Sequence, residues 1–275
     1  MNQPNSVPNK LSIPQGYLLV DGVYLTNLEK TVNAIPRFVY LWHKLNEQQR
    51  IAISPYLPFS KSQFAQDLFV ISELYNKEIN PYFVEFGATN GIDLSNTHLL
   101  ETQLGWQGIL AEPAKIWHER LKQNRRCGID FRCVSNQTGT TVDFLEVLNP
   151  NPQHTVSSPE LSSVKAFANH GDWASEIRVK NSIEYTVPTI SLNDLLAEYN
   201  APREIAYLSI DTEGGELMIL QDFDFSHYRV HLITVEHNFQ NEARNEIHKL
   251  LVSEGYQRKY EDISFVDDWY VYADD

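Results

Sequence analysis

Cysteine, basic residues and long apolar runs are scarce in this sequence, and each shortage excludes a class of protein. The only cysteines are Cys127 and Cys133, whose spacing fits neither a zinc site nor a disulfide framework. With 36 acidic and 22 basic residues, the chain has a formal net charge of −14. Nucleic acids and anionic membranes bind proteins through local positive charge, so we expect neither as a partner.

Hydrophobic segments are short. No run of about 18 apolar residues, the minimum for a membrane-spanning helix, occurs. The N-terminal segment MNQPNSVPNKLSIPQG lacks the charged and apolar regions of a signal peptide, so we expect a soluble, cytoplasmic protein. Hydrophobic residues make up 42% of the 275 positions, which is enough to bury a core as one large domain.

Domain organisation follows from where regular patterns begin. Residues 1–16 contain three prolines and little periodicity, which predicts a flexible arm. Residues 17–61 include the predicted helix PRFVYLWHKLNEQQRIAI, and we expect a helical extension that packs on the main domain. Residues 62–275 form that main domain. Within it, residues 148–183 are a long irregular run, which indicates a lid-like insertion.

Helical and strand patterns alternate through the main domain. An amphipathic helix in SKSQFAQDLFVISELY, with Ser62 as its expected N-cap, precedes an apolar strand at residues 82–86. Further strands are expected in GILAEP, IDFRCV, AYLSID and HLITVE. This alternation predicts an α/β fold with a mainly parallel sheet and helices on both faces. The final segments YQRKYE and ISFVDDWYVYA predict an antiparallel hairpin at its edge.

The segment FVEFGATNG places an acid inside the first strand and glycines after it. Glu85 needs a partner, because burying an unpaired carboxylate costs free energy. Gly87 and Gly91 permit a tight turn, but the glycine pattern of a dinucleotide site is incomplete and Glu85 would repel a phosphate. A cationic nucleoside without phosphates, such as S-adenosylmethionine, removes both difficulties. Glu112, at the end of the next strand, is placed to accept ribose hydroxyls.

Six segments lie in a fixed order between about Ser62 and Tyr272, namely SQFAQD, FVEFGATNG, LSNTHLLE, LGWQGILAEP, IDTEGGE and VEHN. In this order they resemble the segments of FkbM-type S-adenosylmethionine-dependent methyltransferases. It implies a Rossmann-like class I methyltransferase fold with a seven-stranded sheet. It also implies O-methylation of a sugar, a glycan or a natural product.

The resemblance further implies roles for individual residues. It assigns the amino-acid end of the cofactor to residues of the glycine turn, namely Glu85, Gly87, Ala88, Thr89 and Gly91. Glu112 would hold the ribose, and Ser135 would lie beside the adenine. Gln63 and Asp67 would close over the methionine moiety.

Acidic residues also end two later strands. Asp211 ends AYLSID and Glu236 ends HLITVE, so neighbouring strands would bring both close enough to bind one divalent metal ion, such as Mg²⁺. His237 is the expected third ligand, or the base that deprotonates the acceptor hydroxyl. Together with Glu213 as another base, this predicts Asp211, Glu213 and His237 as catalytic residues. Alternatively, Asp211 and Glu236 only cap the helices that follow them.

Two other functions stay open at this point. A nucleotide-dependent oxidoreductase or epimerase is disfavoured by the incomplete glycine pattern and by the antiparallel final hairpin. A catalytically silent module that binds S-adenosylmethionine would keep the same pocket. For the leading function we expect the methyl acceptor to be a small molecule or a glycan.

Overall fold

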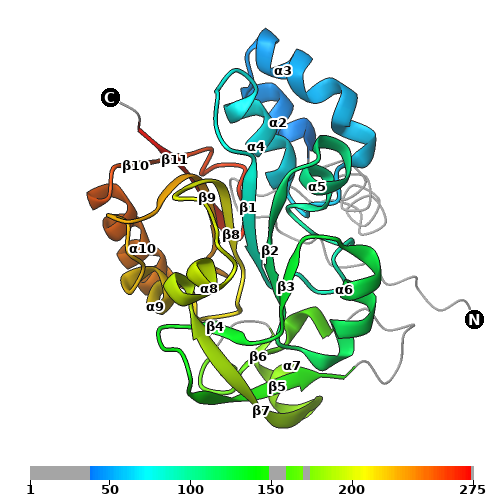
Figure 1. Cartoon of the computed structure of the whole chain (residues 1–275), viewed down its shortest axis with the longest axis vertical. Helices are drawn as coiled ribbons and strands as arrows, with labels where there is room; N and C mark the ends of the chain where they lie inside the picture. Colours follow the sequence, from blue (N-terminus) through cyan, green and yellow to red (C-terminus); the bar gives the residue numbers. More distant parts are fainter. Residues whose placement is uncertain (1–37, 149–158, 170–173, 274–275) are drawn as a thin grey trace, which may run out of the picture.

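A seven-stranded sheet and a smaller four-stranded sheet form the framework of the molecule (Figure 1). The computed structural model describes residues 38–148, 159–169 and 174–273. The predicted arm, residues 1–16, lies outside the described residues, as do residues 17–37 of the predicted extension. Within the described ranges, no helix combines the length and the apolar character needed to cross a membrane.

The large sheet has the strand order β10-β11-β9-β8-β1-β2-β3. Strands β1, β2, β3, β8 and β9 run parallel, whereas β11 is antiparallel to both β9 and β10. The predicted Rossmann-like α/β fold, with a mainly parallel seven-stranded sheet and an antiparallel C-terminal hairpin, is therefore confirmed. The strands are β1 (Tyr82–Phe86), β2 (Gln107–Ala111), β3 (Gly128–Asp130), β8 (Glu204–Ile210), β9 (Arg229–Glu236), β10 (Tyr256–Lys259) and β11 (Asp267–Tyr272).

Helices cover both faces of the large sheet, which explains why its central strands are almost continuously apolar. Side chains of α8, α9 and α10 pack on one face with Val84 and Phe86 of β1. Side chains of α2 to α6 pack on the other face with Phe83, because successive strand residues point to opposite faces. The helices are α2 (Phe38–Lys44), α3 (Glu47–Ile53), α4 (Gln66–Leu74), α5 (His98–Leu104), α6 (His118–Asn124), α8 (Leu192–Glu198), α9 (Glu216–Gln221) and α10 (Asn241–Ser253), with the 3₁₀ turns η1 (Ser54–Phe59) and η2 (Lys115–Trp117).

Two predicted helices differ from the structure: one is divided into two helices, and the other begins at a later residue. The single helix predicted in PRFVYLWHKLNEQQRIAI is wrong, because Asn46 caps α3 by accepting the Gln49 N–H at 3.0 Å and so separates α3 from α2. The predicted N-cap of the next helix is also wrong. Helix α4 begins at Gln66, and the Ser62 hydroxyl donates to the Asp67 carboxylate instead.

The four-stranded sheet, of order β4-β7-β5-β6, is not predicted as a separate sheet, although the pattern of TVDFLEV predicts the strand that is observed as β5. The strand predicted in IDFRCV is wrong as one element, because Asp130 accepts the Arg132 N–H at 2.8 Å where the chain leaves the large sheet. In the predicted insertion, residues 149–158 and 170–173 lie outside the described residues, and its lid-like role stays a prediction. This sheet and its helical segments are β4 (Cys133–Ser135), β5 (Thr141–Val147), η3 (Pro159–Leu161), β6 (Ser163–Val164), α7 (Ser175–Lys180) and β7 (Ser182–Ser191).

Candidate functional site

A cavity of about 310 Å³ lies at the carboxyl ends of β1, β2, β8 and β9. The strand order reverses at β1, with β2 on one side and β8 on the other, and ligands of such sheets bind at this point. Residues of the four-stranded sheet, among them Val134 of β4 and Phe144 of β5, complete the wall. The cavity therefore lies between the two sheets.

The glycine turn after β1 forms one side of the cavity. Gly87 has a φ of +72°, and a Cβ atom there would lie 2.2 Å from the carbonyl oxygen of Asp211. Only glycine allows the turn to approach the end of β8 so closely. Gly87 and Thr89 line the cavity, whereas Ala88 is buried and does not.

The Glu112 carboxylate lies beside this turn, one residue beyond β2. It accepts the backbone N–H groups of Thr89 and Ala114, each at 2.8 Å. Burial raises the pKa of Glu112 from 4.5 to about 7, and the nearby Glu146 carboxylate adds to the rise. A carboxylate has about four acceptor positions, so about two remain for a ligand. Glu112 lines the cavity, and its contact with a ribose stays a prediction.

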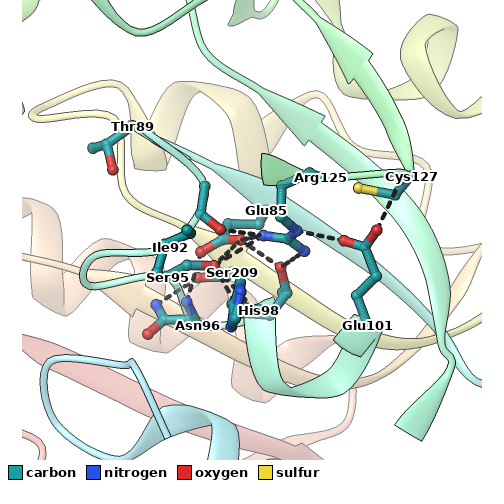
Figure 2. Close-up of polar contacts among 12 residues, drawn as sticks. Glu85, Thr89, Ile92, Ser95, Asn96, His98, Glu101, Arg125, Cys127 and Ser209 are labelled. Atoms are coloured by element: carbon teal, nitrogen blue, oxygen red, sulfur yellow. Dashed lines mark hydrogen bonds and ion pairs between the residues drawn. The ribbon is translucent and has the colours of Figure 1, made fainter. Parts of the chain in front are cut away.

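Glu85 also lines the cavity, and it is buried among hydrogen-bond donors (Figure 2). Its Oε1 accepts the Asn96 N–H at 2.7 Å, and its Oε2 accepts the hydroxyl hydrogens of Ser95 and Thr97. The Arg125 guanidinium lies 3.7 Å from Oε2. Burial raises the pKa of Glu85, and Arg125 with the three donors opposes that rise. Arg125 is thus the charged partner that an acid inside this strand requires.

Arg125 is completely buried and shared between two acids. Its Nε pairs with Glu101 (Figure 2). Its Nη1 donates to the Gly91 carbonyl oxygen at 3.2 Å. A Cβ atom on Gly91 would lie 2.6 Å from the Arg125 side chain. Gly91 is therefore needed to make room for Arg125, and it does not line the cavity as the resemblance implied.

The structure brings Gln63 to the cavity but not Asp67 or Ser135. The Asp67 carboxylate is fully buried and accepts the hydroxyl hydrogens of Ser60 and Ser62 at 2.7 and 2.6 Å, which orders the chain before α4. Ser135 is buried at the end of β4, whereas the preceding Val134 lines the cavity. Neither residue therefore lines the cavity where the resemblance implied contacts with the cofactor.

Asp211, Glu213 and Glu236 form a cluster of acids where β8 and β9 end. One carboxylate oxygen of each lies within 4.8 Å of the other two. Burial, followed by repulsion from neighbouring acids, raises the pKa values of Asp211 and Glu236 well above their usual range. Glu213 has a φ of 59° and pairs with the buried guanidinium of Arg178. The neighbouring strands thus bring together the two acids that the sequence pointed to.

His237 does not join this cluster. Because β9 ends at Glu236 and successive side chains alternate, His237 points away from the cavity. Its Nδ1 accepts the Phe239 N–H at 3.0 Å, and its Nε2 lies 3.9 Å from Asp268. The acid that lies with Asp211 and Glu236 is Glu213, and the metal itself stays a prediction.

Several further cavity residues escaped the sequence analysis. Asp267 of β11 pairs in register with Glu236, and its Oδ2 accepts the Gln66 side-chain N–H at 2.6 Å. Burial raises the pKa of Asp267 to about 7. Trp117 and Arg178 also line the cavity. Of these residues, only Asp267 had a signal in the sequence, because it belongs to a pair of acids, 267–268, within a predicted strand.

Comparisons with known proteins point to one protein family. The model of the family described as Methyltransferase FkbM domain matches residues 85–258, more than half of the chain. Among solved structures, the crystal structure of Methyltransferase FkbM from Methylobacillus flagellatus KT matches with a TM-score of 0.43 and 12% sequence identity. That match covers 89% of this chain and 60% of the other chain. The search of curated proteins found no match.

Replacing Arg125 tests the buried charge network. Arg125→Met should lower the free energy of unfolding by about 3–5 kcal/mol, because Glu85 and Glu101 lose a buried partner. Urea titration measures the loss. Lys249→Met is the control, since Lys249 pairs with Glu246 on the surface and should change stability by about 1 kcal/mol or less. Equal effects of the two substitutions would contradict the interpretation of Arg125 as the central partner.

The raised pKa of Glu112 predicts how stability depends on pH. Between about pH 4.5 and pH 7, the unfolded chain ionises Glu112 while the folded chain keeps it protonated, so stability falls as pH rises. This residue accounts for up to about 3 kcal/mol of that fall. Glutamine at position 112 cannot ionise. In urea titrations between about pH 5 and about pH 7.5, the unfolding free energy of Glu112→Gln should therefore fall less than that of the wild-type protein. Parallel curves for the two proteins would show that Glu112 ionises normally.

Proposed function

This chain belongs to the FkbM methyltransferase family, and we propose that it uses S-adenosylmethionine to methylate a hydroxyl oxygen of its acceptor. The observation that carries the proposal is the position of Glu112. Its carboxylate is held by two backbone N–H groups beside the Gly87 turn, lines the cavity and keeps acceptor positions for a ligand.

The residues of the cavity fit this cofactor. Glu112 would accept the ribose hydroxyls, and the apolar side chains of Trp117, Val134 and Phe144 offer surfaces for the adenine. Gln63, exposed at the cavity, carries an amide that can donate to the methionine carboxylate. When bound, S-adenosylmethionine supplies an electrophilic methyl group on its positively charged sulfur.

The chain's own residues would orient the acceptor and take its proton. Methylation of a hydroxyl oxygen would require a residue of this chain to accept the proton that the hydroxyl loses, while the cofactor's sulfur would keep the electron pair of the broken carbon–sulfur bond. An alcohol does not ionise near neutral pH, so a base or a Lewis acid must assist it. The carboxylates of Asp211, Glu213 and Glu236 lie at the cavity and are the available proton acceptors, whereas His237 does not line it.

A divalent cation such as Mg²⁺ or Mn²⁺ is the second part of the proposal. Asp211, Glu213 and Glu236 offer three oxygen ligands within 4.8 Å of one another, which is the donor type that these hard cations prefer. When bound, the cation would lower the pKa of the acceptor hydroxyl. In the alternative, the three acids act through hydrogen bonds alone.

The charge of the cavity favours an uncharged acceptor. Eight of its described lining residues are acids, and among those described residues Arg178 is the only base. Arg178 already pairs with Glu213. A phosphate or carboxylate on the acceptor would be repelled, whereas the hydroxyl of a neutral sugar, glycan or natural product would not. The same charge disfavours the pyrophosphate cofactor of an oxidoreductase or epimerase.

Calorimetric titration tests the cofactor. The protein should bind S-adenosylhomocysteine and not NAD. Glu112→Ala should weaken binding by about tenfold or more, because one or two charge-assisted hydrogen bonds are lost. Glu119→Ala, an exposed acid on α6, should bind like the wild type. Unchanged affinity in folded Glu112→Ala protein would reject the ribose contact. Turnover on a panel of neutral hydroxyl acceptors then separates an enzyme from a silent binding module.

Removal of divalent cations tests the metal. After exhaustive chelation, methyl transfer should be lost, and Mg²⁺ or Mn²⁺ should restore it. Binding of Mn²⁺ followed by electron paramagnetic resonance gives a second measurement, and Asp211→Asn should abolish it. Asp222→Asn, outside the cavity, is the matched control. Full activity in chelator, together with no Mn²⁺ binding, would support the alternative in which the acids only form hydrogen bonds.

A further inference from the structure

Asn96 lines the cavity with an acceptor atom that the protein does not use. The residue is 8% exposed, and its Nδ2 donates to the Ser209 hydroxyl oxygen at 2.9 Å. Its Oδ1 is buried and has no hydrogen-bond partner among the described residues. A buried acceptor without a partner is unfavourable, so a ligand that supplies a donor would relieve it.

The orientation of Asn96 is set from two sides (Figure 2). Glu85 accepts the backbone N–H of Asn96 and the hydroxyl hydrogens of the residues on either side, Ser95 and Thr97. Ser209 of β8 holds the side-chain amide. The position of Oδ1 is therefore fixed before any ligand arrives.

The surrounding charge favours a cationic donor. Two carboxyl groups, those of Glu85 and Glu101, share the single guanidinium of Arg125 in this buried group. The oxygens of Glu85 already accept hydrogen bonds from the loop. Glu85 therefore orders the loop and makes its surroundings more negative, while Asn96 supplies the acceptor atom for the ligand.

We propose that Asn96 Oδ1 accepts a hydrogen bond from the α-ammonium group of the methionine moiety of S-adenosylmethionine, an inference that rests on the proposed function. Glu85 is then a positioning residue that orders residues 95–97 and makes the subsite negative. This assigns a binding contact to a residue that the sequence analysis did not single out. It also gives Glu85 a role that differs from the direct contact implied by the resemblance.

Two ligands that differ only at the amino-acid end test the inference. S-adenosylhomocysteine carries the ammonium group, and 5′-methylthioadenosine has the same nucleoside without it. In calorimetric titrations, Asn96→Ala should weaken S-adenosylhomocysteine binding by about tenfold or more and change methylthioadenosine binding by about twofold or less. Glu112→Ala should weaken both ligands by a similar factor, because both contain the ribose.

Asn96→Asp tests whether the ligand needs a hydrogen-bond acceptor or a donor at position 96. It keeps an oxygen in place of Oδ1 and should bind S-adenosylhomocysteine within about threefold of the wild type, or more tightly. If Asn96→Ala does not fold, as judged by thermal unfolding, Asn96→Leu replaces it with a similar shape and no acceptor.

Three results would overturn the inference. They are no loss of S-adenosylhomocysteine affinity in Asn96→Ala, an equal loss for both ligands, or a loss in Asn96→Asp as large as in Asn96→Ala. Failure of the wild-type protein to bind S-adenosylhomocysteine would be a different outcome, since it would reject the proposed function and, with it, this contact.

Discussion

The buried guanidinium of Arg125 is the interaction on which the cavity wall depends. It lies between Glu85 of β1 and Glu101 of α5, and it donates to the Gly91 carbonyl oxygen. One charged group thus joins the first strand, the turn after it, the following helix and the chain beyond α6. Because charges without partners are costly in the interior, these segments can pack together only in the arrangement that satisfies all of them. The fixed loop at residues 95–97 follows from that arrangement.

The second feature of the site is that acidic side chains predominate in its cavity. Acids stand at or just beyond the carboxyl ends of β1, β2, β8 and β9, and in the described chain only Arg178 lines the cavity as a base. Burial, followed by repulsion among these acids, raises the pKa values of Asp211 and Glu236. Positive charge on a ligand or a cation relieves this repulsion. A positively charged methyl donor, an ammonium group and a divalent metal are all consistent with the same field.

The four-stranded sheet contributes the other half of the cavity. A small apolar cluster joins Trp117, which precedes α6, to Cys133, Phe144 and Val187 of this sheet. On the opposite side, Arg178 of α7 donates to the Leu161 carbonyl oxygen at 2.9 Å and pairs with Glu213. The sheet is thus tied both to the proposed adenine side and to the acid cluster. A displacement of this sheet would therefore move residues at both ends of the cavity.

The sequence by itself determined the parallel sheet, the C-terminal hairpin, the glycine turn and the position of Glu112 at a strand end. These features depend on local periodicity and on glycine, whose signals lie within a few neighbouring residues. Only the tertiary structure decided the four-stranded sheet, the pairing of Gln66 with Asp267, the exclusion of Asp67 and His237 from the cavity and the free acceptor of Asn96. Each of these depends on which face of an element is buried and on partners far apart in the chain, and spacing along the chain encodes neither.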